Sequence, residues 1–177
     1  MFAVALVLAA CTSDGDVSTE TTSPVTTSPV TTSPVTTSPV TTSPVTTSLL
    51  TVPDELAGLP IAPAVLDGET VVLAVADTDE TRATGLMGVS DLGDVFGMLF
   101  VFPEVRETGF WMRDVPIALD IAFFDADGGY VDGFTMPTCP DGDCPSYPTP
   151  GPVSFAMEAP AGALAHLGPG SVLELDG

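Results

Sequence analysis

Short apolar runs separated by turn residues fill the chain from residue 52 onward. Residues 70–77 consist mainly of Val and Ala around Leu73, a pattern typical of a buried strand. Residues 97–102 are apolar at every step after Gly97, which predicts a central strand covered on both faces and ended by Pro103. Similar patterns predict five more strands, over residues 109–114, 119–125, 130–136, 153–158 and 171–176.

Two short helices and a hairpin complete the predicted domain. Asp77 and Glu80 stand at N-cap and N3 spacing, so we expect a helix through Thr84 that Gly85 or Gly88 stops. Residues 161–167, rich in Ala and Leu, predict a second helix. Residues 126–129 read Ala-Asp-Gly-Gly, which favours a tight turn because Gly and Asp tolerate positive φ. The sequence therefore predicts a mainly β (α+β) domain, barrel-like or a sandwich, with about seven strands and two helices.

The first residues predict an export signal. Residues 2–10 are an apolar run, far shorter than the roughly 20 residues of a membrane-spanning helix. The run ends in Leu8-Ala9-Ala10-Cys11, which resembles the lipobox of bacterial lipoproteins, where the Cys is acylated and becomes the first residue. No Lys or Arg precedes it, so either translation starts upstream or the signal is weak. We expect residues 1–11 to be a lipoprotein-type signal that anchors the exported protein at the outer face of the cytoplasmic membrane or cell envelope.

A low-complexity stretch follows the signal. From residue 21 to 45 the unit Thr-Thr-Ser-Pro-Val occurs five times in succession. Regular proline blocks helix and sheet, and one Val per unit offers too little apolar surface to offset the entropy of ordering. Residues 12–51 are therefore expected to be a disordered stalk, with a reach of at most about 120 Å. A binding role for the repeat and O-glycosylation of its Ser and Thr are alternatives that the sequence leaves open.

Charge excludes several classes of function. The chain has 24 acidic residues against three Arg and no Lys, for a net charge of -21. A phosphate-loop lysine and a Schiff base are impossible, and such a field repels nucleic acid. One His, His166, cannot form a multi-histidine metal centre. All but three acidic residues lie in the predicted domain, residues 52–177, so the charge belongs to the folded part.

Four blocks of the domain carry a family resemblance. They are residues 81–87 (TRATGLM), 97–102 (GMLFVF), 110–114 (FWMRD) and 119–123 (LDIAF), with Cys139-Pro140 and residues 144–147 (CPSY) further on. In this order they resemble the family of domains of unknown function 192, over about residues 70–175. The resemblance implies an often exported prokaryotic domain, and the family has no established activity.

Four residues are the candidate ligand site. Alternation along residues 110–114 places Trp111 and Arg113 on one face, where a rigid ring and a guanidinium suit a carboxylate. Arg82 and Asp120 are expected to converge on that face, because so few cations must find partners among many acids. The alternative is that the arginines are structural ion pairs that hold an acidic domain together.

Other polar groups predict structure rather than chemistry. Cys139 and Cys144 flank a turn sequence, and an exported domain favours a disulfide between them. The spacing of Asp125 and Asp127 is similar to that of a calcium-binding loop. The EF-hand pattern does not fit, because Tyr130 stands where it requires Gly, so a hairpin turn is the better interpretation. His166 is expected near the end of the second helix, where a cation suits the helix dipole. We assign no catalytic residue, metal ligand or cofactor.

The leading hypothesis is a non-enzymatic envelope lipoprotein whose β-rich domain binds a small ligand, a cell-wall component or another envelope partner. The alternatives are an enzyme of unknown reaction that uses the face of Arg82, Trp111, Arg113 and Asp120, and a purely structural surface module. Nucleic acid is not an expected partner.

Overall fold

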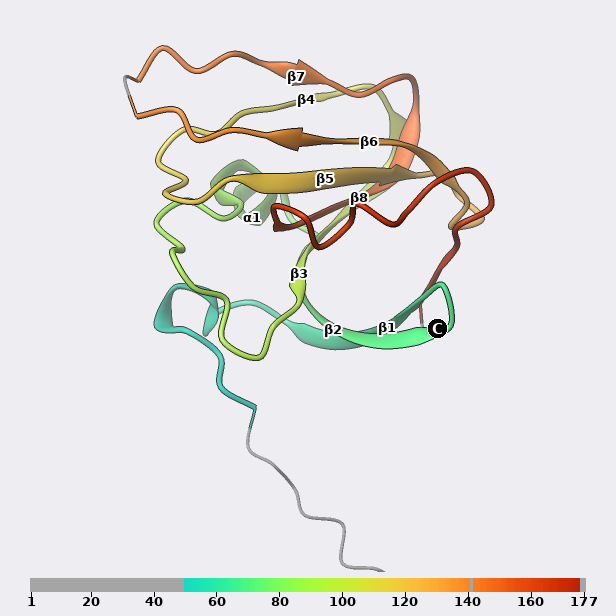
Figure 1. Ribbon diagram of the computed structural model, residues 1–177, viewed down its shortest axis with the longest axis horizontal. Helices are drawn as coiled ribbons and strands as arrows, with labels where there is room; N and C mark the ends of the chain where they lie inside the picture. The colour runs from blue at the N-terminus through green and yellow to red at the C-terminus, as the bar shows by residue number, and fades with distance from the viewer. Residues whose placement is uncertain (1–49, 141, 176–177) are drawn as a thin grey trace, which may run out of the picture. The chain divides into compact units, whose positions relative to one another are not determined.

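The computed structural model describes residues 50–140 and 142–175 (Figure 1). The expected signal, with Cys11, lies outside the described residues, as does nearly all of the expected stalk. In the described part, no helix has the length and apolar character needed to cross a membrane.

A curled sheet of seven strands forms the domain (Figure 1). Its strand order is β6-β5-β8-β3-β2-β1-β9, and β4 and β7 pair separately. Among the strands of the described residues, β2 and β3 pair in parallel, and every other pair is antiparallel. The elements are η1 (Asp54–Leu56), β1 (Ile61–Leu66), β2 (Glu69–Ala76), α1 (Asp79–Thr84), β3 (Gly97–Arg106), β4 (Gly109–Phe110), β5 (Leu119–Phe124), β6 (Tyr130–Met136), β7 (Tyr147–Pro148), β8 (Val153–Pro160) and β9 (Leu173–Leu175).

The two ends of the sheet meet at one corner. The turn between β5 and β6 bridges to the start of β9, where the Leu173 amide donates to the Gly128 carbonyl at 2.8 Å. A Cβ atom on Gly128 would collide with the Leu173 carbonyl, so this approach requires glycine. The sheet is thus a half-barrel, and the prediction of a mainly β, barrel-like domain is confirmed.

Apolar side chains cover both faces of the central strands. On β3, Phe100 belongs to one buried cluster and Leu99 to the other, and Ala156 and Met157 divide in the same way on β8. Strand β5 is buried at all six positions. These strands therefore lack the polar alternation of a half-exposed sheet, as the sequence predicts for residues 97–102.

Strand β1 was not expected. It pairs with β2 through the turn at Asp67 and Gly68, whose φ angles are 51° and 83°. Two consecutive positive φ values define the tight turns for which Asp-Gly is favoured. The dipeptide was a readable hairpin signal, but Pro63 interrupts the apolar run before it.

Strand β3 continues past Pro103, contrary to prediction, and ends at Arg106. Its partner β2 accompanies it only as far as Phe100, so one edge of β3 is free beyond that residue. The register with β8 also shifts between Val101 and Arg106. A proline is tolerated there because its missing N–H leaves no ladder bond unmade.

The prediction of a second helix is wrong. Residues 161–167 form successive turns, with short-range bonds such as Leu167 N–H to the Leu164 carbonyl. Gly162 has φ of 93°, and its amide and that of Leu164 donate to Asp120 instead of helix carbonyls. His166 is exposed and has no helix dipole to complement.

Two predicted boundaries also move. Thr78, not Asp77, caps α1, because Thr78 and Thr81 exchange side-chain and backbone hydrogen bonds in a capping box. The strand expected over residues 109–114 is only Gly109–Phe110, and the chain then turns, with φ of 56° at Asp114.

Candidate functional site

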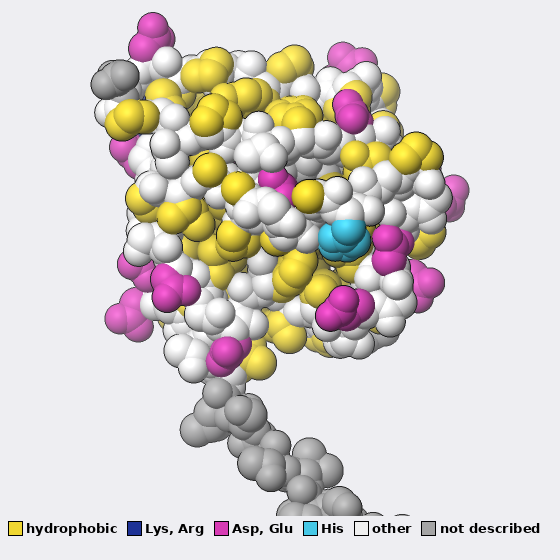
Figure 2. Space-filling view, viewed as in Figure 1, with side chains coloured by type: hydrophobic (Ala, Val, Ile, Leu, Met, Phe, Trp, Pro, Cys, Tyr) yellow, Lys and Arg dark blue, Asp and Glu magenta, His cyan; other side chains and the backbone are white. Residues whose placement is uncertain are grey.

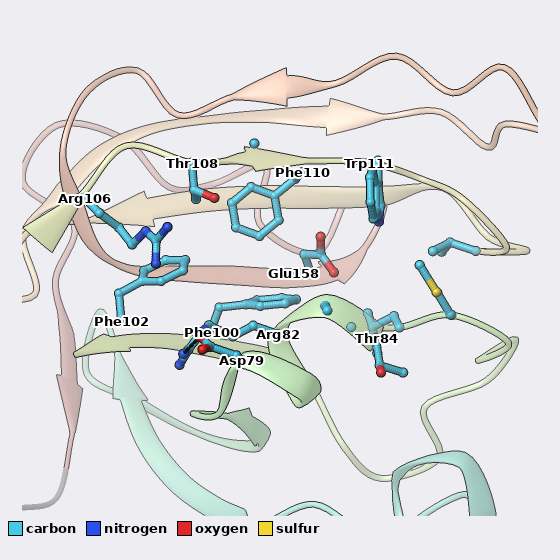
Figure 3. Close-up of a pocket in the computed structure, with 16 residues that line it drawn as sticks. Asp79, Arg82, Thr84, Phe100, Phe102, Arg106, Thr108, Phe110, Trp111 and Glu158 are labelled. Atoms are coloured by element: carbon cyan, nitrogen blue, oxygen red, sulfur yellow. Dashed lines mark hydrogen bonds and ion pairs between the residues drawn. The ribbon is translucent and has the colours of Figure 1, made fainter. Parts of the chain in front are cut away.

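A pocket of about 230 Å³ opens between α1 and the strands β3, β4 and β8 (Figure 3). We call it the aromatic pocket and define it by Phe100, Phe102, Phe110, Trp111 and Glu158, all of which line it. Its volume is below the roughly 300–1,000 Å³ of pockets for drug-sized ligands, so it suits a small molecule.

The end of α1 closes on one wall of the pocket. Gly85 follows the helix with φ of 50°, and a Cβ atom there would lie 3.4 Å from the ring of Phe100. The glycine therefore provides both the positive φ and a close approach of the backbone to the aromatic wall.

Aromatic rings make up this wall and the mouth of the pocket. Phe100 on β3 and Phe110 on β4 meet edge to face, with ring centroids 5.2 Å apart and an interplanar angle of 89°. Phe110 is buried, whereas Trp111 is 49% exposed. Because adjacent residues of an extended segment point to opposite sides, Phe110 belongs to the core and Trp111 to the surface.

Glu158 is the buried polar group of the pocket. It lies on β8, opposite Met98 of β3 and Ile121 of β5, both fully buried. Glu158 is only 4% exposed, and burial raises the pKa of its carboxyl from 4.5 to about 8. Figure 3 shows the carboxyl between Phe100, Phe110 and Trp111.

No hydrogen bond or ion pair joins the Glu158 carboxyl to another described residue, and burial is the one cause of its raised pKa. In this part of the chain, no fully enclosed side-chain oxygen or nitrogen lacks a partner. The Glu158 oxygens are therefore not fully enclosed, and the free space beside them is the pocket.

Arg82 holds α1 against β3. One guanidinium nitrogen donates to the carbonyls of Asp77 and Val101 at 2.6 and 2.7 Å, and the other donates to Asp79 at 2.7 Å. Asp79 is almost fully exposed, so this ion pair contributes little stability. The bond to the Val101 carbonyl joins α1 to β3, and the bond to Asp77 ties the side chain to the segment before the helix. Arg82 lines the pocket, but its donors are largely occupied.

The other two arginines stack on aromatic rings. Arg106 lies 6.0 Å from the ring centroid of Phe102, and Arg113 lies 5.2 Å from that of Trp111. Neither forms a salt bridge in the described part of the chain. The alternative in which the arginines are structural ion pairs therefore applies to Arg82 alone.

A family profile matches residues 63–175 of this chain, which is more than half of it. Its family is DUF192, described as "Uncharacterized ACR". The chain belongs to the DUF192 family.

Two crystal structures are similar to this DUF192 domain. A protein of unknown function from Novosphingobium aromaticivorans DSM 12444 has 30% identity and a TM-score of 0.61, with 72% of this chain and 94% of that one covered. A protein from Sinorhizobium meliloti 1021, described as a candidate transcription regulator, has 26% identity and a TM-score of 0.58, with 66% and 95% covered. Among curated proteins, none matches the chain.

The DUF192 fold separates the four residues of the sequence-predicted site. Arg82 and Trp111 line the aromatic pocket, and Arg113 stacks on Trp111 without lining it. Asp120 is elsewhere: it lines a smaller cavity of about 110 Å³. It accepts hydrogen bonds from the Thr135 hydroxyl at 2.6 Å and from the amides of Gly162 and Leu164 at 2.7 and 3.0 Å. The expectation that Asp120 converges with Trp111 is therefore wrong.

Glu158 is the pocket residue that the sequence analysis missed. It was counted only as the last residue of a predicted strand over residues 153–158. The available signal was a single carboxylate inside the apolar run of β8, since a charged residue in a strand covered on both faces has no access to bulk water.

Two further polar features have structural roles. Cys139 and Cys144 form a disulfide across the turn between them. Asp125 accepts hydrogen bonds from the amides of Asp127 and Gly129 at 2.9 and 2.8 Å, which makes the expected calcium-like segment a hairpin turn. Within residues 50–140 and 142–175, no three His, Cys, Asp or Glu side chains gather as a metal site.

Proposed function

We propose that this DUF192 domain binds a small molecule in the aromatic pocket, with Glu158 as the group that fixes the ligand. The observation that carries the proposal is Glu158, a residue only 4% exposed, whose carboxyl lines the pocket and has no partner among the described residues. Burying a carboxyl without a partner costs several kcal/mol or leaves it neutral. A ligand that supplies the missing partner explains why β8 carries a Glu among apolar residues.

The composition of the pocket supports binding. Ligand sites are mostly apolar and aromatic, with a few placed polar groups, and this pocket combines four aromatic side chains with one buried carboxyl. A purely structural module would gain stability from an apolar residue at position 158, because its cross-strand neighbours Met98 and Ile121 are apolar.

Binding is better supported than catalysis. The face expected for an enzyme included Asp120. Its carboxylate instead accepts hydrogen bonds from the turn amides of Gly162 and Leu164, away from the aromatic pocket. A carboxyl with a raised pKa can act as a general acid, but the other carboxyl in the lining, Asp79, is 97% exposed and paired with Arg82. Turnover of a bound compound would favour the enzyme alternative.

We also propose that the protein is a lipid-anchored envelope protein with residues 12–51 as a stalk. The apolar run and the lipobox-like Leu8-Ala9-Ala10-Cys11 support this proposal. A Cys11→Ser variant should then lose the acyl mass and move from the membrane to the soluble fraction. Unchanged processing and membrane partitioning of that variant would reject the anchor without affecting the pocket.

The description of the Sinorhizobium meliloti protein gives no support for nucleic acid as a partner of this chain. A net charge of -21 with three Arg repels a polyanion. Figure 2 shows acidic side chains scattered over one face of the domain, in keeping with this repulsion.

A thermal-shift screen of the full chain tests the proposed function. The screen should include small amines, alcohols, acids and sugars, and at least one class should raise the melting temperature. Ala83→Trp places a large ring at the pocket mouth on the exposed side of α1 and should abolish the shift. Ala126→Trp, at the exposed hairpin tip, is the matched control and should keep it. The proposal fails if no compound shifts the wild type, or if hits survive Ala83→Trp.

A further inference from the structure

The chemistry of the aromatic pocket narrows the class of ligand. Resting on the proposed function, we infer that the ligand is a small amine in its ammonium form, whose N–H groups donate to the Glu158 carboxylate while aromatic rings surround its carbon skeleton. This assignment goes beyond binding as such, because it excludes anions and makes a neutral isostere the weaker ligand.

The first support is the hydrogen-bonding deficit of Glu158. An ionised carboxylate only accepts hydrogen bonds, and the described residues supply none to it. For the ionised form of Glu158, the missing partner is therefore a donor. An ammonium group brings up to three N–H donors together with the positive charge that would balance a buried carboxylate.

The second support is the aromatic surroundings. The Glu158 carboxyl lies among Phe100, Phe110 and Trp111 (Figure 3). Ring faces attract cations through their quadrupole, and the attraction is stronger where water is excluded. A carboxylate within an aromatic cage is a combination that suits an organic cation and disfavours an anion.

The arginines of the pocket do not cancel this preference. Arg82 and Arg106 both lie over the ring of Phe102, at 5.8 and 6.0 Å. Figure 3 places Phe102 and Arg106 to one side, away from Trp111. Arg82 is already paired with Asp79 and two carbonyls. These three charged side chains, all from α1 and β3, are the only ionisable groups besides Glu158 in the lining of the pocket.

The charge of the whole chain also favours a cationic ligand. A net charge of -21 raises the concentration of cations near the surface and lowers that of anions, most strongly at low ionic strength. An ammonium ligand would therefore be attracted before it reaches the pocket, whereas a carboxylate would be repelled.

Binding should be coupled to release of a proton. In the free protein, the raised pKa leaves Glu158 mostly protonated at pH 7, and the ammonium binds the ionised form. About 0.9 proton should leave for each ammonium bound at pH 7, and affinity should rise about tenfold between pH 6 and pH 7, then level off above pH 8. A neutral ligand would show neither effect.

Calorimetric titration of the full chain with three matched probes tests the inference. The probes are phenethylammonium, 2-phenylethanol and 3-phenylpropionate, and the proteins are wild type, Glu158→Gln and Glu107→Gln. Phenethylammonium should bind wild type at least tenfold more tightly than the alcohol at pH 8, and the carboxylate should not bind. Glu158→Gln should lose that preference, while Glu107→Gln, which removes an exposed carboxylate beside Arg106, should match wild type.

The outcomes separate this inference from the proposed function. Equal or tighter binding of the alcohol or the carboxylate, abolished by Ala83→Trp, would overturn the ammonium assignment and leave the pocket a ligand site. No binding of phenethylammonium at millimolar concentration would also overturn it, and the broad screen would still decide whether the pocket binds anything. An undiminished ammonium preference in a correctly folded Glu158→Gln variant would show that Glu158 is not the partner.

Discussion

Glu158 on β8 lies directly opposite Met98 on β3, so a carboxyl group and a thioether occupy neighbouring positions on the same buried face of the sheet. Met98 belongs to a buried apolar and aromatic cluster, and the aromatic pocket lies beside the Glu158 carboxyl. Burial among apolar neighbours explains the raised pKa of Glu158, and the pocket explains how a ligand could reach it.

The stability of the free protein should fall as pH rises from 5 to 8. The folded state holds Glu158 protonated up to about pH 8, whereas the unfolded chain ionises it near 4.5, so the unfolded state binds fewer protons in this window. The loss is on the order of 4–5 kcal/mol at full ionisation. Denaturant unfolding at pH 5, 6.5 and 8 measures it.

Glu158→Gln is the control for this pH dependence, because it keeps the shape and removes the charge. Its stability should change much less over the same range. The hydroxyl of Ser171 and the amide of Val172 lower the pKa of Asp67. Asp67 therefore changes the stability of the protein only below its ordinary pKa of 3.8, outside this pH range. Parallel pH profiles for wild type and Glu158→Gln would show that Glu158 is not the buried acid.

Arg82→Ala should destabilise the domain by about 1–3 kcal/mol, because it leaves the carbonyls of Asp77 and Val101 without their donor. Arg113→Ala removes only an exposed contact with Trp111 and should cost less than about 1 kcal/mol. Urea denaturation of the two variants compares them. Equal losses would contradict the role of Arg82 in joining α1 to β3.

Asp120→Ala should destabilise the domain by about 2–4 kcal/mol and leave ligand binding intact. It removes the acceptor for the Thr135 hydroxyl and for two turn amides, which become unsatisfied donors. Unfolding measurements, together with titration of any hit from the screen, test both statements. Loss of binding in a folded Asp120→Ala protein would restore Asp120 to the site.

The central strands could be predicted because their sequence carries the information locally. Residues 97–102 are apolar throughout, and burial on both faces of β3 follows from that alone. Strand β1 was not predicted because Pro63 interrupts its apolar run, although Asp67-Gly68 is a sequence signal for the turn that follows it. The helix expected over residues 161–167 failed because Asp120, about 40 residues earlier, captures the amides that a helix would need.

The site was only half predictable for a related reason. Alternation correctly separates Phe110 and Met112, which are buried, from Trp111 and Arg113, which are exposed. Alternation cannot say which distant segment a strand faces, so it gave no sign of Glu158. The expectation that Asp120 lies beside Trp111 came from the scarcity of cations, which does not say which acidic residue is close. That information lies in the strand order, which brings β8 between β3 and β5.

Carbon-detected NMR titration of the Glu158 side-chain carboxyl, with and without a hit from the screen, tests the central claim most directly. The free protein should titrate this carboxyl with a midpoint near 8, and a bound amine should move its resonance and lower the midpoint. A midpoint near 4.5 that no compound alters would contradict the claim that Glu158 is buried without a partner and binds the ligand.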